Sequence, residues 1–173
     1  MGSNCRKGSE VGMAKKSKKK FEDVKIAIVG SSGGHLTHMM LLKDMWKDHE
    51  RFFVTFDKPD ANSQLKDEKV YHCHYPTNRN FKNLIKNTFL AWKILRKEKP
   101  DMIISSGAAV AMPFFFLGKL FFRKKCVYVE VFDRIDKSTL SGKFCYYFSD
   151  KFFVQWEEQL KVYKKAIYLG SIF

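Results

Sequence analysis

Short apolar runs and helical apolar stripes alternate along most of the chain. The run Val24–Gly30 (VKIAIVG) is rich in aliphatic residues and stops at a glycine, which is typical of a buried parallel strand. Apolar residues then recur at helical spacing from Leu36 to Trp46. The sequence therefore predicts a strand, a glycine-containing turn and a helix at the start of the folded region.

The same alternation continues towards the C-terminal end. Six further runs are predicted strands: Arg51–Phe56, Lys69–His74, Asp101–Gly107, Lys125–Phe132, Lys151–Trp156 and Ala166–Ser171. An apolar stripe from Phe81 to Leu95 predicts a long helix that ends before Pro100, with lysine and arginine on its opposite face. Strands that alternate with helices predict an α/β fold, a doubly wound Rossmann-like parallel sheet.

Composition supports one folded domain with a charged extension. The chain has 173 residues, of which 45% are hydrophobic and 16% aromatic, and this excludes disorder along the whole length. The formal net charge is +14, and seven basic residues but one acidic residue fall in the first twenty positions. We expect a flexible polybasic tail over residues 1–20 and a domain over 21–173. Such a charge implies an anionic partner: nucleic acid, anionic lipid or a phosphorylated substrate.

Several classes of protein are excluded by what the sequence does not contain. The four cysteines form no CxxC pair, so neither a zinc site nor a redox motif is indicated, and we expect no metal and no cofactor. In His72-Cys73-His74, alternation along a strand sends Cys73 to the opposite face from the two histidines. The sequence shows no secretory signal and no run of about 20 apolar residues, so secretion and a membrane-spanning helix are not expected.

The turn after the first strand is the first candidate site. Gly30–Leu36 (GSSGGHL) leads from a strand into a helix, where amide groups and the helix dipole favour an anion. Its spacing fits neither a dinucleotide nor a nucleoside-triphosphate motif, and a tight turn that only needs glycine is the alternative. Ser32, Gly33 and Gly34 are the candidate phosphate contacts. His35 can serve as a base or, protonated, meet a diphosphate; a capping or exposed histidine is the alternative.

Two further strand ends carry polar residues. Ser106 and Gly107 follow a predicted strand, so their loop is expected to share a crevice with the first glycine turn and to contact the same anion. Glu130 and Arg134 close the next strand. Glu130 is a candidate base or sugar-hydroxyl ligand, and Arg134 a candidate diphosphate ligand. The alternative is an ordinary ion pair between an acidic neighbour and Arg134.

The segment Ala108–Phe122 is apolar, rich in phenylalanine and followed at once by cations. It is too short to cross a bilayer, but a helix of this kind can lie in the membrane interface. A buried core helix is the alternative; consecutive aromatic residues point in different directions around a helix, which favours the interface. The predicted membrane contacts are Phe114, Phe115, Phe116, Lys119, Phe121, Phe122, Arg123 and Lys124.

Four motifs give the chain a family resemblance. They are Gly30–Leu36, Ser106-Gly107 with the apolar segment after it, Val129–Ile135 (VEVFDRI) and Asp150–Trp156 (DKFFVQW). In this order they resemble the asparagine-linked-glycosylation subunit fourteen family and its bacterial capsular and exopolysaccharide relatives, from Val24 to the C-terminal end. That family is similar to the N-terminal half of MurG-type GT-B glycosyltransferases.

The resemblance implies a role and a partner. It implies an acceptor-binding subunit, at the cytoplasmic face of a membrane, for a polyprenyl-diphosphate-linked sugar; a second subunit, a GT-B C-terminal half, would bind the UDP-sugar. The N-terminal spanning helix usual in dolichol-pathway members is not seen here, and Val131 stands where many relatives have serine. Two alternatives remain: a non-catalytic membrane adaptor and a basic nucleic-acid-binding module. No RNA-binding signature is found, so nucleic acid is not the expected partner.

Overall fold

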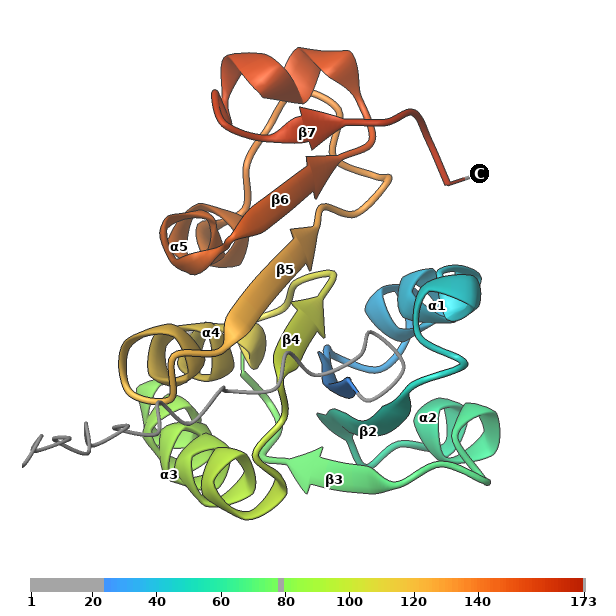
Figure 1. The fold of residues 1–173 in the computed structure, drawn as a ribbon, viewed down its shortest axis with the longest axis vertical. Helices are drawn as coiled ribbons and strands as arrows, with labels where there is room; N and C mark the ends of the chain where they lie inside the picture. The colour runs from blue at the N-terminus through green and yellow to red at the C-terminus, as the bar shows by residue number, and fades with distance from the viewer. Residues whose placement is uncertain (1–23, 78–79, 173) are drawn as a thin grey trace, which may run out of the picture.

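The computed structural model describes residues 24–77 and 80–172. These residues form one parallel sheet with helices on both faces (Figure 1), which confirms the predicted fold class. The polybasic tail predicted for residues 1–20 and the first residues of the predicted domain lie outside the described residues.

The sheet has seven strands in the order β3-β2-β1-β4-β5-β6-β7, and every neighbouring pair is parallel. The strands are β1 (Lys25–Val29), β2 (Glu50–Phe56), β3 (Val70–Cys73), β4 (Met102–Ser105), β5 (Lys125–Val129), β6 (Lys151–Val154) and β7 (Ile167–Tyr168). All seven lie within runs that the sequence predicts, apart from the first residue of β2. The strand order reverses direction between β1 and β4, so the chain has a topological switch point there.

Five α-helices connect the described strands. They are α1 (Gly34–Leu41), α2 (Pro59–Gln64), α3 (Phe81–Glu98), α4 (Ala111–Leu120) and α5 (Leu140–Phe148), with short 3₁₀ turns η2 (Lys43–Met45) and η3 (Glu157–Lys161). Asn80 caps α3 by accepting a hydrogen bond from the Asn83 amide. None of these helices is long and apolar enough to span a bilayer, within the part of the chain that the structure describes.

Alternate residues of each strand build two cores. Ile26 and Ile28 of β1 pack with α1 and α2, whereas Ala27 and Val29 pack on the other face with α3, α4 and α5 (Figure 1). Burial of both faces explains why the strands are apolar runs rather than alternating ones. The predicted alternation at His72-Cys73 is also found, because Cys73 is buried and His72 is exposed.

Helix α4 corrects the predicted membrane segment. Phe114 and Phe115 are 0% exposed, so they offer no membrane surface, and Phe116 is partly buried. The reason is that α4 lies between α3 and α5 as well as against the sheet, so it has core on three sides (Figure 1). Consecutive phenylalanines can all be buried there: the Phe115 ring contacts Tyr128 of β5, and that of Phe116 contacts Phe148 of α5.

The C-terminal end of α4 differs from its middle. Phe121 is 59% exposed and Arg123 is exposed, whereas Phe122 and Lys124 are partly buried. Lys119 donates to Asp150 at 2.7 Å, so its ammonium is already engaged in an ion pair within the fold. Of the eight predicted membrane contacts, Phe121 and Arg123 are the ones that lie clearly at the surface.

Candidate functional site

The glycine turn after β1 and the Ser106-Gly107 turn after β4 lie at one edge of the sheet. Val29 pairs with Ser105 in the parallel register of β1 and β4, so both strands deliver their following turns to the same carboxyl edge. This is the switch point, where open α/β sheets commonly bind ligands. The predicted convergence of the two turns is confirmed.

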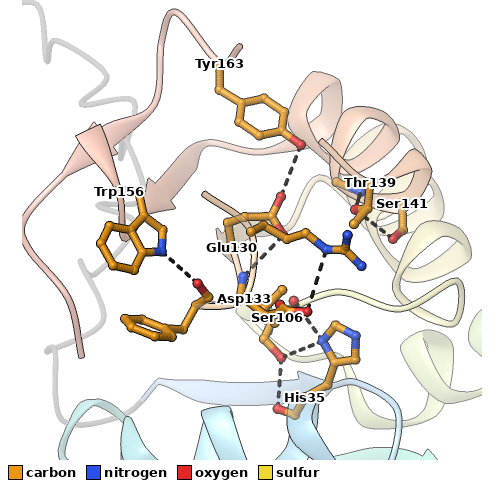
Figure 2. A network of polar contacts seen from close by, with 12 residues as sticks. His35, Ser106, Glu130, Asp133, Thr139, Ser141, Trp156 and Tyr163 are labelled. Atoms are coloured by element: carbon orange, nitrogen blue, oxygen red, sulfur yellow. Dashed lines mark hydrogen bonds and ion pairs between the residues drawn. The ribbon is translucent and has the colours of Figure 1, made fainter. Parts of the chain in front are cut away.

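The His35 side chain joins the two turns (Figure 2). Its Nδ1 lies 3.0 Å from the backbone oxygen of Ser106, and the Ser106 hydroxyl donates to the His35 carbonyl at 2.9 Å. Because a carbonyl oxygen only accepts, Nδ1 carries the proton and donates it, which leaves Nε2 with a free lone pair in the neutral ring. Burial lowers the pKa of His35 below its usual value of 6.5, so the neutral form dominates at pH 7.

Gly107 makes this close approach possible. Its φ is +125°, a backbone conformation that favours glycine, and a Cβ there would lie 2.9 Å from Cε1 of His35 and 2.7 Å from the Tyr128 hydroxyl. Ser106 and Gly107 are themselves buried, at the base of the His35 ring. We therefore correct their predicted role: they hold His35 in position and do not face a ligand.

The glycine turn itself is only partly open to an anion. Gly33 has φ +77°, and a Cβ on Gly33 or Gly34 would meet no atom within 4 Å, so there is space beside both residues. The Gly33 amide, however, donates to the Asp60 carboxylate at 2.7 Å. The Gly33 amide, a predicted phosphate contact, therefore already has an acceptor within the fold. Gly34 and His35 begin α1, where first-turn amides have no acceptor within the helix.

A cavity of about 950 Å³ opens beside His35, and we call it the edge cavity. Segments far apart in sequence line it: Ser31, Ser32, His35, Phe56, Lys58, Tyr75, Thr77, Asn80, Phe81, Leu84, Ala108, Ala109, Met112, Thr139, Leu140 and Ser141. One part of this lining carries hydroxyls and the imidazole, and the other is aromatic and aliphatic. Such a lining suits a ligand with a polar head and an apolar tail.

A second hollow of about 380 Å³ shares His35 with the edge cavity. It is lined by Gly34, His35, Thr37, His38, Val131, Phe132 and Asp133. The imidazole therefore borders two separate spaces at the carboxyl edge. A group held in one space and a group held in the other would both have access to the same ring.

Glu130 does not reach either space. It is 0% exposed, and its carboxylate accepts hydrogen bonds from the Tyr163 hydroxyl at 3.1 Å and from the Val131 amide at 3.2 Å (Figure 2). Burial raises the pKa of Glu130 to about 7. A Cβ on Gly142 would come within 2.7 Å of this carboxylate, so the group packs under the start of α5. The Glu130 carboxyl is therefore buried away from both spaces, and the predicted contact with substrate is not found in this arrangement.

Arg134 lies near His35 but does not line the edge cavity: after burial, its positive charge is one of the causes that lower the pKa of His35. Its guanidinium is 3.8 Å from the Asp133 carboxylate, and it does not belong to the lining of either space. The alternative interpretation of this pair, an ion pair between neighbours, is the one that the geometry supports. The cation of the edge cavity is Lys58 instead.

Sequence reasoning missed Lys58, Tyr75, Thr139 and Ser141. Lys58 could have been found, because it follows β2 directly and the carboxyl ends of parallel strands meet at one edge. Thr139 caps α5 by accepting from the Gly142 amide at 2.8 Å. The apolar pattern along this helix is too weak to predict it from the sequence. Tyr75 lies in the loop after β3 and Ser141 in the first turn of α5, where no apolar periodicity marks them.

Comparison with solved structures identifies the fold. Acinetobacter baumannii MurG superposes with a TM-score of 0.64 at 13% identity, over 78% of this chain and 42% of MurG. A UDP-N-acetylglucosamine 2-epimerase from Rickettsia bellii superposes with a TM-score of 0.68 at 13% identity, over 87% of this chain and 45% of the epimerase. The chain therefore spans less than half of each of these proteins and has the Rossmann-like fold of one half of a GT-B protein.

Sequence comparison identifies the family. The human "UDP-N-acetylglucosamine transferase subunit ALG14" is 26% identical over 87% of this chain and 84% of its own length. The Candida albicans subunit of the same name is 26% identical over 91% of this chain and 82% of its own length. A family model described as "Oligosaccharide biosynthesis protein Alg14 like" matches residues 76–172, which is more than half of the sequence. The chain belongs to the Alg14 family.

Proposed function

We propose that this chain is the acceptor-binding, membrane-associated subunit of a two-component UDP-N-acetylglucosamine transferase that extends a polyprenyl-diphosphate-linked sugar. The relatives that carry the transferase-subunit name support the reaction class and the donor. The edge cavity supports acceptor binding, because its lining combines polar groups with a large apolar wall. In this proposal the partner subunit holds the UDP-sugar and residues 21–173 form the acceptor domain.

The observation that carries the proposal is the fixed tautomer of His35. Nε2 of the neutral ring accepts the proton of the acceptor hydroxyl as that oxygen attacks C1 of the donor sugar. The new glycosidic bond forms, the bond from C1 to the diphosphate oxygen breaks, and UDP leaves with the electron pair. The low pKa of His35 favours return of the proton to water after transfer. Amides at the start of α1 support the acceptor's diphosphate.

Membrane association is assigned to α3 rather than to the middle of α4. Four large side chains of α3 are exposed along one stripe: Phe81 (77%), Ile85 (58%), Phe89 (68%) and Trp92 (39%). Trp92 contacts Phe121 at a ring-centroid distance of 5.7 Å, so the stripe continues onto the exposed end of α4. Exposed lysines of α3, Lys82, Lys86 and Lys93, flank it and suit anionic headgroups at the cytoplasmic face. We call the exposed apolar residues Phe81, Ile85, Phe89, Trp92 and Phe121 the α3 stripe.

The α3 stripe and the edge cavity are continuous. Phe81 belongs to both, and Leu84 of the next turn also lines the cavity. An acceptor whose prenyl chain lies in the bilayer would therefore present its diphosphate and sugar at the mouth of the cavity. This arrangement favours an acceptor-binding subunit over an adaptor that only tethers its partner.

The test is transfer by the complete two-subunit enzyme with His35→Ala. Loss of a general base is expected to lower kcat by about 10²- to 10⁴-fold, with vesicle binding and partner binding unchanged. His72→Ala is the matched control, because His72 is exposed on β3 and does not line the edge cavity. Undiminished transfer by His35→Ala would remove His35 from the reaction and leave the membrane-adaptor function as the better explanation.

A further inference from the structure

Lys58 is the one fully cationic side chain in the lining of the edge cavity, and that lining contains no carboxylate. The chain is strongly basic, yet its other lysines and arginines, among the described residues, lie outside this lining. Among the residues that line the cavity, Lys58 is therefore the strongest electrostatic partner for a phosphate.

The Lys58 side chain is held by an aromatic pair. Its Nζ lies 4.2 Å from the ring centroid of Tyr75, within the range of a cation–π interaction. The Tyr75 ring in turn contacts Phe56 edge-on at a centroid distance of 5.1 Å, and Phe56 is anchored in the core. All three residues line the edge cavity. The ammonium is thus positioned by a ring, which leaves its N–H groups free to donate to an oxygen anion.

A second contact brings Lys58 towards the glycine turn. Lys58 is the residue before α2, and Asp60 in the first turn of α2 accepts the hydrogen bond from the Gly33 amide. This bond fastens the start of α2 to the turn that precedes α1. Ser31 and Ser32 of that turn line the same cavity as Lys58. The ammonium and the two serine residues therefore border one polar region of the edge cavity.

We propose that Lys58 binds the phosphate oxygens of the lipid-linked acceptor, with Tyr75 as its positioning residue. This proposal rests on the proposed function and deepens it, since it names the cation that neutralises the diphosphate. Lys58 lines the edge cavity, whereas Arg134, the cation that the sequence predicts, lies beside Asp133 and does not line it. The apolar part of the cavity, including Phe81, Leu84 and Met112, receives the first prenyl units next to the phosphates.

The experiment measures binding of farnesyl diphosphate to the full-length chain by calorimetry. Lys58→Gln is expected to weaken binding about 10- to 100-fold, as for loss of a hydrogen bond between charged groups, and Lys58→Arg to retain most of the affinity. Lys66→Gln removes the same charge from an exposed position outside the cavity and is expected to bind like the unaltered chain. Inorganic pyrophosphate is expected to bind more weakly but to show the same dependence on Lys58.

Variants of Tyr75 test whether its ring positions the Lys58 ammonium. Tyr75→Leu removes the ring beneath the ammonium and is expected to weaken farnesyl diphosphate binding about 2- to 5-fold. Tyr75→Phe keeps the ring and is expected to restore binding. A loss of affinity in both variants would contradict the cation–π role and assign the effect to the Tyr75 hydroxyl.

The outcomes distinguish this proposal from the proposed function. If the unaltered chain binds farnesyl diphosphate and Lys58→Gln binds it equally well, the assignment of Lys58 is overturned and the acceptor-binding function stands. Equal weakening by Lys58→Gln and Lys66→Gln would indicate a general charge effect and would also overturn it. If the unaltered chain binds neither farnesyl diphosphate nor pyrophosphate, the acceptor-binding function fails together with the assignment.

Discussion

The side chains around His35 divide into those that can touch a ligand and those that fix its ring. His35, Ser32 and Lys58 line the edge cavity, whereas Ser106, Gly107 and Glu130 are buried beneath it. The contacts of Ser106 and the close approach of Gly107 reduce the freedom of the imidazole, and positioning of a reacting group to within a fraction of an ångström is a large part of catalysis. Substitutions in the buried layer are therefore expected to act through geometry and stability.

Glu130 provides a pH-dependent test of this buried layer. Its folded-state pKa of about 7 lies above the ordinary 4.5, because burial disfavours the carboxylate. The folded state therefore binds more protons than the unfolded state between these values, and stability falls as pH rises from 5 to 8. Glu130→Gln cannot ionise, so it should be more stable than the unaltered chain at pH 8 by up to about 3 kcal/mol and similar at pH 5.

Urea denaturation at the two pH values measures this difference. Glu158→Gln, a change at an exposed position of η3, is the control and should alter the free energy of unfolding by less than about 0.5 kcal/mol at either pH. A Glu130→Gln variant that differs from the unaltered chain by the same amount at pH 5 and pH 8 would show that the carboxyl does not titrate in this range.

At the residue scale, sequence reasoning succeeded where one short segment carries the geometry. His35 follows a glycine turn that joins a strand to a helix, and that local pattern alone brings it to the carboxyl edge. The sequence does not predict the places of Ser106, Glu130 and Lys58, because side chains from several loops decide whether a residue lines a cavity or is buried beneath it. The Ser106 backbone oxygen and the His35 ring, 71 positions apart, meet only in the folded chain.

Elements were predicted well where their environment is simple. A strand buried on both faces is a continuous apolar run, so β1 to β7 were found. The interior of α4 was misjudged because apolarity does not tell whether a helix is covered by lipid or by two neighbouring helices. Helix α3 is more polar overall. The sequence shows its apolar stripe, but not whether that stripe faces the core or the solvent.

The α3 stripe gives a prediction at the scale of the element. Phe89→Ser combined with Phe121→Ser removes two exposed rings, which should reduce partitioning to vesicles of phosphatidylglycerol and phosphatidylcholine about 10- to 100-fold. Leu169→Ser, at the opposite end of the sheet after β7, removes a similarly exposed apolar side chain and should leave partitioning unchanged (Figure 1). Flotation of the full-length proteins with vesicles measures both.

The same flotation experiment can contradict the assignment. If the double variant floats like the unaltered chain, the α3 stripe does not hold the protein on the bilayer, and basic residues alone become the better explanation. Raising the ionic strength distinguishes that case, because attraction between exposed charges is screened within about 8 Å at physiological salt, whereas burial of aromatic rings is not.

The whole molecule corresponds in fold to one half of a GT-B protein. Its match to MurG covers 42% of that protein, and the shared fold is a single sheet with its helices. In the proposed arrangement the acceptor enters the edge cavity, and the donor sugar reaches His35 from the second hollow, which the same imidazole borders. Two spaces around one base are the arrangement that transfer between two separately bound substrates needs.

This arrangement predicts complementation between two chains. The full-length chain alone should bind farnesyl diphosphate but transfer no labelled N-acetylglucosamine from UDP-N-acetylglucosamine to a polyprenyl-diphosphate-sugar acceptor. Addition of a UDP-sugar-binding subunit of the GT-B C-terminal-half type should produce transfer, and His35→Ala should abolish most of it without preventing assembly. If that second subunit, tethered to vesicles by an unrelated anchor, transferred sugar equally well without this chain, acceptor binding by the edge cavity would be unnecessary, and the chain would be an adaptor.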